Sequence, residues 1–179
     1  IRSAAALQLA AMGRHAAAVR HLLLLALEVG DELVVPHALN ALSRLGDERV
    51  VPHVVRRLAA GKDDQWTLEA AKRLGPAASA AVPYLRRLVR ETEGNTRVVA
   101  AHALGGMGAA SVGAIDDVAD FLTAGYEGAG AAWALRQWGE LARPALPRLL
   151  KFVADPAAEK TARNGAIDAV AAIGADEEA

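Results

Sequence analysis

The sequence predicts an all-α solenoid, in which pairs of helices repeat along the chain. The first observation is a glycine that recurs roughly every thirty residues, a period typical of repeat arrays. The second is an apolar stripe at helical spacing before each of these glycines. The third is that no long stretch alternates with period two, so no sheet is expected. The recurring glycines are Gly13, Gly46, Gly75, Gly108, Gly139 and Gly174.

The segment before each glycine is predicted to be the second helix of a pair. In the repeat that ends at Gly108, the stripe consists of Ala100, Ala103, Leu104 and Met107. The small residues allow a neighbouring helix to come close, and the larger ones fill the remaining space. The glycine then ends the helix because it tolerates a left-handed backbone.

A second apolar stripe follows each glycine and predicts the first helix of the next pair. These stripes are Val82, Leu85 and Leu88, then Ile115, Val118 and Phe121, then Leu146, Leu149 and Phe152. After Gly46 the stripe starts earlier, at Val51, which predicts a tighter turn. Pro83 and Pro147 predict helices that begin late or kink. Asp155 and Pro156 predict the end of another helix.

Composition excludes several classes of protein. The 179 residues carry a net charge of −1, whereas a dedicated nucleic-acid binder is usually strongly basic. No cysteine is present, which excludes a disulfide framework, a thiolate zinc site and a thiol nucleophile. This fits a reducing compartment, so we expect a cytoplasmic protein. The longest apolar run is too short to span a membrane, and no membrane partner is expected.

Three strings carry a family resemblance. Residues 74–85 are LGPAASAAVPYL, close to L-G-x-x-A-x-x-A-V-P-x-L, and residues 96–108 are TRVVAAHALGGMG, close to V-R-x-x-A-x-x-A-L-x-x-x-G. Residues 46–52, GDERVVP, are a third such string. The strings resemble HEAT repeats, in the short form also seen in phycobilisome-lyase-like proteins. The signature strings of tetratricopeptide and ankyrin repeats, which have a similar period, are absent.

The resemblance covers essentially the whole chain. It implies a right-handed α-solenoid of about five to six HEAT-like helix pairs, forming a single domain over residues 1–179. Because the chain opens inside a repeat, we expect it to be part of a longer array. The family also implies a ladder of paired charges that starts from an Arg at the head of each second helix. Arg2, Arg97 and Arg163 match this position, whereas Val35, Asp64 and Gly128 do not, so the ladder should be interrupted.

The resemblance implies that second helices line a concave groove that binds a protein or peptide partner. Trp133 beside Arg136 fits such a groove, since Trp and Arg are enriched at interface hot spots. The alternative is a solvated helix face on which Glu69 and Lys72 form an ion pair. The predicted partner-binding residues are Asn40, Glu69, Lys72, His102, Trp133 and Arg136. The sequence therefore predicts a non-catalytic protein-binding scaffold without a cofactor.

Two other functions remain open at this point. The chain could be a lyase-like or chaperone-like factor that handles a prosthetic group. It could also be a HEAT-like DNA glycosylase or nucleic-acid binder that stacks bases on Trp66 and Trp133, although the expected groove is near neutral. Trp138 falls on a buried stripe and is expected in the core. No H-E-x-x-H spacing occurs among the histidines, so no metal site is expected.

Two further patterns have a structural interpretation that we prefer to a functional one. A charged row on the first helices, Arg57, Arg87, Asp120 and Lys151, could be a docking surface. We favour a solvated face with ion pairs between repeats. The glycine-rich segment that contains Gly125, Gly128 and Gly130 lacks the strand and Lys of a phosphate-binding loop. It is expected to be a loop followed by a frayed helix start.

Overall fold

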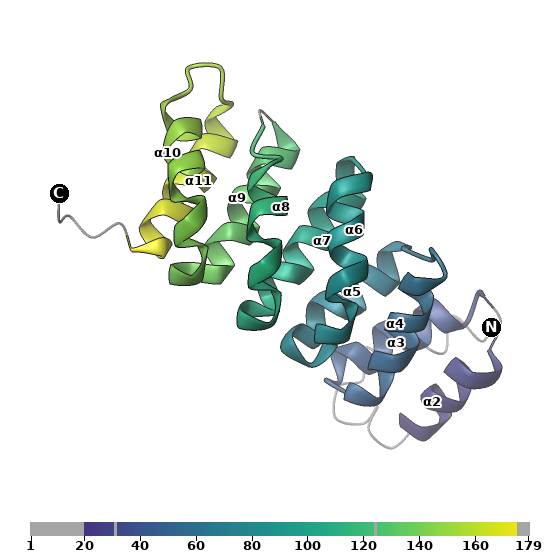
Figure 1. The fold of residues 1–179 in the computed structure, drawn as a ribbon. Coiled ribbons are helices and arrows are strands. Elements are labelled where there is room, and N and C mark those ends of the chain that lie inside the picture. Colours follow the sequence, from purple (N-terminus) through teal and green to yellow (C-terminus); the bar gives the residue numbers. More distant parts are fainter. Residues whose placement is uncertain (1–19, 31, 124, 175–179) are drawn as a thin grey trace. The chain divides into compact units, whose positions relative to one another are not determined.

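A computed structural model describes residues 20–30, 32–123 and 125–174, and all their regular elements are helices (Figure 1). No strand occurs within these ranges, which confirms the all-α prediction. The chain divides into two compact units, Ile1–Ala81 and Val82–Ala179, called here the N-terminal and C-terminal units. No helix of the described ranges combines the length and apolar character that crossing a bilayer requires.

The described part of the N-terminal unit is built around α3, which packs against α2 and α5. Helix α5 also packs against α4, so the four helices share one core that includes Leu39, Val54 and Leu68. The helices are α2 (Arg20–Val29), α3 (Val35–Arg44), α4 (Val51–Ala59) and α5 (Gln65–Leu74), with 3₁₀ helices η2 (Glu48–Val50) and η3 (Gly75–Ala81).

The C-terminal unit consists of three consecutive helix pairs. Its helices are α6 (Val82–Glu91), α7 (Gly94–Gly106), α8 (Ile115–Ala119), α9 (Tyr126–Trp138), α10 (Leu146–Ala154) and α11 (Lys160–Ile173), with 3₁₀ helices η4 (Gly108–Ala114) and η5 (Gly139–Ala145). Each pair contains a first and a second helix that pack together: α6 with α7, α8 with α9, and α10 with α11. The second helices are also neighbours, with α9 between α7 and α11 (Figure 1).

The periodic glycines end the second helices as predicted. Those within the described residues have positive φ angles, 64° at Gly46, 53° at Gly75, 57° at Gly108, 53° at Gly139 and 67° at Gly174, whereas Gly13 lies outside the described residues. The small residues of the stripes are fully buried, which confirms the assigned helix faces. Those with 0% exposure include Ala38, Ala100, Ala103, Ala131, Ala166 and Ala169.

The segments after the glycines explain why the first helices begin late. Seven residues of 3₁₀ helix precede α6, α8 and α10, whereas only the three residues of η2 precede α4. The tighter turn predicted after Gly46 is therefore confirmed. Pro83 and Pro147 are the second residues of α6 and α10, where a missing N–H costs no helical hydrogen bond. Asp155 directly follows α10, as predicted.

The prediction for the glycine-rich segment is only partly confirmed, because Gly125, with a φ angle of 89°, lies outside α9 as its N-cap residue. Gly128 and Gly130 are buried inside the regular helix α9 rather than in a loop or a frayed helix start. A Cβ on Gly130 would lie 2.7 Å from Cγ1 of Val98 on α7. Gly105 of α7 mirrors this arrangement, because its Cβ would lie 2.7 Å from the carbonyl oxygen of Ala134. These glycines therefore allow α7 and α9 to approach closely, a role that the glycine-rich string did not reveal.

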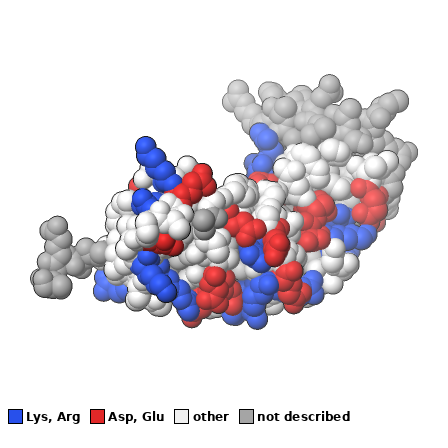
Figure 2. All heavy atoms as spheres, turned by 90° about the horizontal axis from the view of Figure 1, so that it is seen from above, with Lys and Arg blue, Asp and Glu red and all other residues white. Residues whose placement is uncertain are grey.

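Charged side chains of the first helices pair between successive helix pairs of the C-terminal unit. Arg86 Nε lies 2.6 Å from Asp117 Oδ2, and Arg90 Nε lies 3.2 Å from Asp117 Oδ1. Arg148 of α10 is 2.8 Å from Asp116 and 3.4 Å from Asp120. Figure 2 shows basic and acidic groups next to one another on the surface of the molecule. Of the predicted row, Asp120 thus takes part in an ion pair between helix pairs, whereas Arg57 in the N-terminal unit departs from the expected solvated face, because its side chain is only 11% exposed.

The expected charge ladder takes a different form in this chain. Arg97, at the head of α7, pairs with Glu127 of α9 at 2.9 Å. Arg163, at the equivalent place in α11, instead donates to the carbonyl oxygens of Asp155 and Ala158. Among the described residues, the expected pairing with a carboxylate is therefore found at Arg97, whereas Arg163 departs from it by binding backbone carbonyl groups.

Candidate functional site

In the C-terminal unit, the predicted site residues meet on α7 and α9. The rings of His102 and Trp133 are in contact, with centroids 4.0 Å apart and planes tilted by 45°. The close approach at Gly105 and Gly130 brings the two helices near enough for this contact. Trp133 remains 41% exposed, so the His102 ring supports one part of the indole while another part faces solvent. Arg136 is exposed one turn further along α9.

A second exposed aromatic residue on the same helix face was missed by the sequence analysis. Tyr126 is 60% exposed, and its hydroxyl donates to Asn95 Oδ1 at 3.1 Å. Because Tyr126 precedes Trp133 by two helical turns, the two side chains share one face of α9, with a rise between them of about 10.5 Å. This heptad spacing of aromatic residues was the signal in the sequence.

In the N-terminal unit, Arg73 contacts two of the other three predicted residues, Asn40 and Glu69, and Glu69 in turn contacts the third, Lys72. Arg73 Nη1 donates to Asn40 Oδ1 at 2.8 Å, and Arg73 Nη2 lies 3.6 Å from Glu69 Oε2. Lys72 Nζ lies 2.9 Å from Glu69 Oε1, which is the ion pair expected if this is a solvated helix face rather than a binding groove. Asn40 corrects the expectation of a uniformly exposed face, because it is only 5% exposed. It lies on α3, which is covered on two sides by α2 and α5.

A polar hollow adjoins this network at the C-terminal ends of α3 and α5. It is lined by Ser43, Arg44, Gly46 and Arg73, and its volume is about 490 Å³. Arg44 is exposed and forms no ion pair with a described residue. The Ser43 hydroxyl donates to the Asn40 carbonyl at 3.1 Å and is thereby occupied. The two guanidinium groups are therefore the groups that this hollow offers to a ligand.

At the other ends of the same helices lies a second pair of rings. His37 of α3 and Trp66 of α5 have centroids 5.7 Å apart, and both residues are half-buried. Each unit thus contains one His–Trp pair between neighbouring second helices. In both pairs the earlier helix supplies the histidine and the later one the tryptophan.

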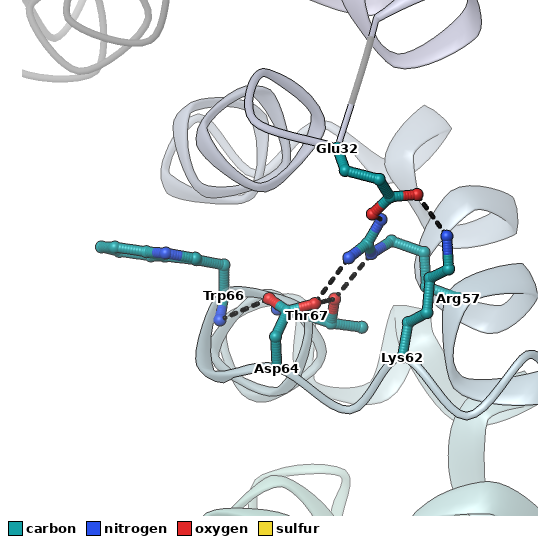
Figure 3. A network of polar contacts seen from close by, with 6 residues as sticks. All are labelled: Glu32, Arg57, Lys62, Asp64, Trp66 and Thr67. Atoms are coloured by element: carbon teal, nitrogen blue, oxygen red, sulfur yellow. Dashed lines mark hydrogen bonds and ion pairs between the residues drawn. The ribbon is translucent and has the colours of Figure 1, made fainter.

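A polar network fixes the start of α5 and with it the place of Trp66. Asp64 caps the helix by accepting from the backbone N–H groups of Trp66 and Thr67. Arg57 lies 2.6 Å from Asp64 Oδ2 and 3.2 Å from Glu32, and Glu32 also contacts Lys62. Figure 3 shows the indole of Trp66 extending away from this network.

The pKa values in this network favour charged carboxylates. Burial alone would raise the pKa of Asp64, but hydrogen bonds from Arg57 and Thr67 outweigh it and leave the pKa below its usual value. Hydrogen bonds from Lys62 and Arg57 lower the pKa of Glu32. Both groups therefore stay ionised at neutral pH and hold Arg57 in place.

The third tryptophan belongs to the core, as predicted. Trp138 is 3% exposed, and its Nε1 donates to the Gly108 carbonyl and to Ser111 Oγ, both at 3.1 Å. Within the described ranges, no three His, Asp or Glu side chains converge in a way that could hold a metal ion. Trp66 and Trp133 are therefore the tryptophans that can contact a ligand among the described residues.

The chain matches no protein-family model, and a comparison with curated proteins finds no significant match. The six predicted site residues form two groups, one in each unit. The N-terminal group consists of Asn40, Glu69 and Lys72, and the C-terminal group of His102, Trp133 and Arg136. The C-terminal group presents an aromatic face and a guanidinium group suited to recognition, whereas the amide of Asn40 in the N-terminal group is buried.

Proposed function

We propose that this chain is a non-catalytic scaffold of the HEAT-repeat type, which binds a protein or peptide partner through the faces of its second helices. The observation that carries the proposal is Trp133, which is 41% exposed and in contact with His102. Arg136 lies one turn away and Tyr126 two turns away on the same helix. Large aromatic and Arg side chains of this kind dominate binding energies at protein interfaces.

The support of Trp133 by His102 favours binding on entropic grounds. A side chain that is already ordered loses less rotamer freedom when a partner covers it. Such a ring contributes large contact area at a low entropic cost, as aromatic residues do in other recognition surfaces. Its neighbour Arg136 adds directional hydrogen bonds to carboxylates or carbonyls. The combination describes a binding surface that is largely formed before the partner arrives.

The test is partner capture from a native lysate, followed by measurement of affinity with the identified protein. A Trp133→Ala, Arg136→Ala double variant is expected to weaken binding by about 30-fold or more, equivalent to about 2 kcal/mol. Leu141→Ala is the matched control, because Leu141 is 46% exposed but lies in η5. Helicity measured by circular dichroism should be unchanged in both variants. Equal affinity of the double variant and the wild type would refute the proposed surface.

A further inference from the structure

We propose that the N-terminal unit carries a site for an acidic peptide, which deepens and rests on the proposed partner-binding function. The hollow between Arg44 and Arg73 takes a carboxylate of the peptide. The His37–Trp66 pair takes an apolar side chain of the same peptide. Four residues from two neighbouring helices thus define one site with a basic end and an aromatic end.

The basic end is held in position before a ligand binds. Asn40, 5% exposed, accepts a hydrogen bond from Arg73 Nη1 at 2.8 Å, and Glu69 contacts Nη2 from the same helix. These contacts use only part of the five N–H groups of a guanidinium. The remaining N–H groups of Arg73 and those of Arg44 line a hollow of about 490 Å³. Planar guanidinium groups bind carboxylates with two parallel hydrogen bonds, so this geometry suits that ligand.

The charge of the site complements an anion. Arg44, Arg73 and Lys72 supply three positive charges, and Glu69 supplies one negative charge. The C-terminal ends of α3 and α5 each add about half a negative charge from the helix dipole. The balance is about one positive charge, which matches a single carboxylate. Two exposed cations without an incoming anion would otherwise repel each other across the hollow.

The aromatic end lies at the same distance from the basic end on both helices. His37 precedes Arg44 by seven residues on α3, and Trp66 precedes Arg73 by seven residues on α5. Seven residues are two helical turns, a rise of about 10.5 Å, so the four side chains lie on the shared face of the helix pair. Ring faces of this kind accept prolyl and aliphatic side chains.

This spacing selects the conformation of the peptide. In a polyproline II segment, side chains three residues apart project on one side with a separation of about 9.3 Å. An apolar residue and a glutamate at this separation would reach both ends of the site. An extended backbone also leaves its carbonyl groups free to accept hydrogen bonds. The occupant is therefore a partner segment with the pattern apolar-x-x-acidic, stiffened by proline.

The experiment uses the full chain and the capped peptides Gly-Leu-Pro-Pro-Glu-Gly and Gly-Glu-Pro-Pro-Leu-Gly, which cover both directions. Binding of at least one of them, measured by NMR titration or calorimetry, is expected. Replacing its Glu by Gln should weaken binding by about 3- to 10-fold, because Gln keeps a neutral hydrogen bond and loses only the additional strength of the charge-assisted one. Arg44→Gln should have a similar effect and leave the fold intact, because Arg44 is exposed. Lys151→Gln, an exposed cation of the C-terminal unit, is the control.

The outcomes separate this inference from the proposed function. Equal binding of the Glu and Gln peptides, or no binding of either direction, overturns the acidic-peptide site. The inference is also overturned if inorganic phosphate competes with the peptide at constant ionic strength and Leu→Ala in the peptide has no effect on binding. Such a result would show that the site binds anions in general rather than an acidic peptide. Partner capture that depends on Trp133 can persist in both cases, whereas loss of that dependence refutes the proposed function instead. Binding that requires Glu, Leu and Arg44 supports the inference.

Discussion

The close approach of α7 and α9 makes Gly105→Ala the most informative substitution. The new Cβ would lie 2.7 Å from the carbonyl oxygen of Ala134 and 3.3 Å from its C and Cα atoms, and backbone cannot rotate away as a side chain would. Ordinary contacts of this kind begin at 3.4 Å. The helices would therefore have to separate by roughly 0.7 Å, which lies within the range of gaps that weaken packing contacts substantially.

The magnitude follows from two opposing effects. Overpacking in a close-packed contact costs about 1–3 kcal/mol, whereas Ala in place of a helical Gly gains at most about 1 kcal/mol. Gly105→Ala should therefore lower the free energy of unfolding by about 0–2 kcal/mol. Gly165→Ala is the matched control in α11, because its Cβ would lie an ordinary 3.6 Å from Ala132 Cβ. The control should gain up to about 1 kcal/mol from the same change in propensity.

Thermal melting followed by circular dichroism measures the difference between the two variants. One kcal/mol corresponds to about 2–4 °C for a chain of this size, so Gly105→Ala should melt several degrees below Gly165→Ala. The comparison cancels the effect of the amino-acid change itself and isolates the helix contact. If both variants rise in melting temperature by the same amount, α7 and α9 do not approach as closely as the structure shows.

Three other substitutions test the polar contacts. Asp64→Ala should cost about 1 kcal/mol at pH 7 through loss of the helix cap. Because the pKa of Asp64 is depressed in the folded chain, its contribution is full above the unfolded-state pKa of about 3.9 and disappears as pH falls through the lower folded-state value. The difference in melting temperature from wild type should thus shrink between pH 7 and pH 3, and a constant difference would contradict this. Asp117→Asn breaks contacts with Arg86 and Arg90 at a side chain only 15% exposed, so it should cost about 1 kcal/mol, less in high salt. Arg148→Gln, whose partners are 75% and 69% exposed, should cost less than about 0.5 kcal/mol, and the reverse order would be evidence against the pairing.

The helices were predictable because each repeat carries its own local signals. Buried residues such as Ala100 and Leu104 follow helical spacing, and Gly108 ends the helix with a backbone that few other residues adopt. Both signals act within one helix and need no knowledge of its neighbours. The same holds for the ion pair between Glu69 and Lys72, which lie one turn apart.

The candidate site depended on contacts between helices and was predictable only in part. The sequence indicated which helices carry polar residues, but not the angle at which each helix faces its neighbours. That angle buries Asn40 and brings Arg73, which was not among the predicted site residues, into the centre of the network. The contact of His102 with Trp133 likewise depends on how closely two separate helices approach. Single-helix patterns contain no information about such distances.

The 3₁₀ segments make the repeats unequally tolerant of changes in length. A 3₁₀ helix turns by about 120° per residue, so one inserted residue in η4 would rotate α8 by a third of a turn. Ile115 and Val118, now buried, would then point toward solvent. The connection at residues 155–159, between α10 and α11, contains no helix, and an insertion beside the exposed Pro156 would avoid this rotation while it perturbs the hydrogen bonds from Arg163 to the carbonyl groups of Asp155 and Ala158. Tags or inserted domains therefore belong in that connection, and length variation among natural variants should be confined to its equivalents.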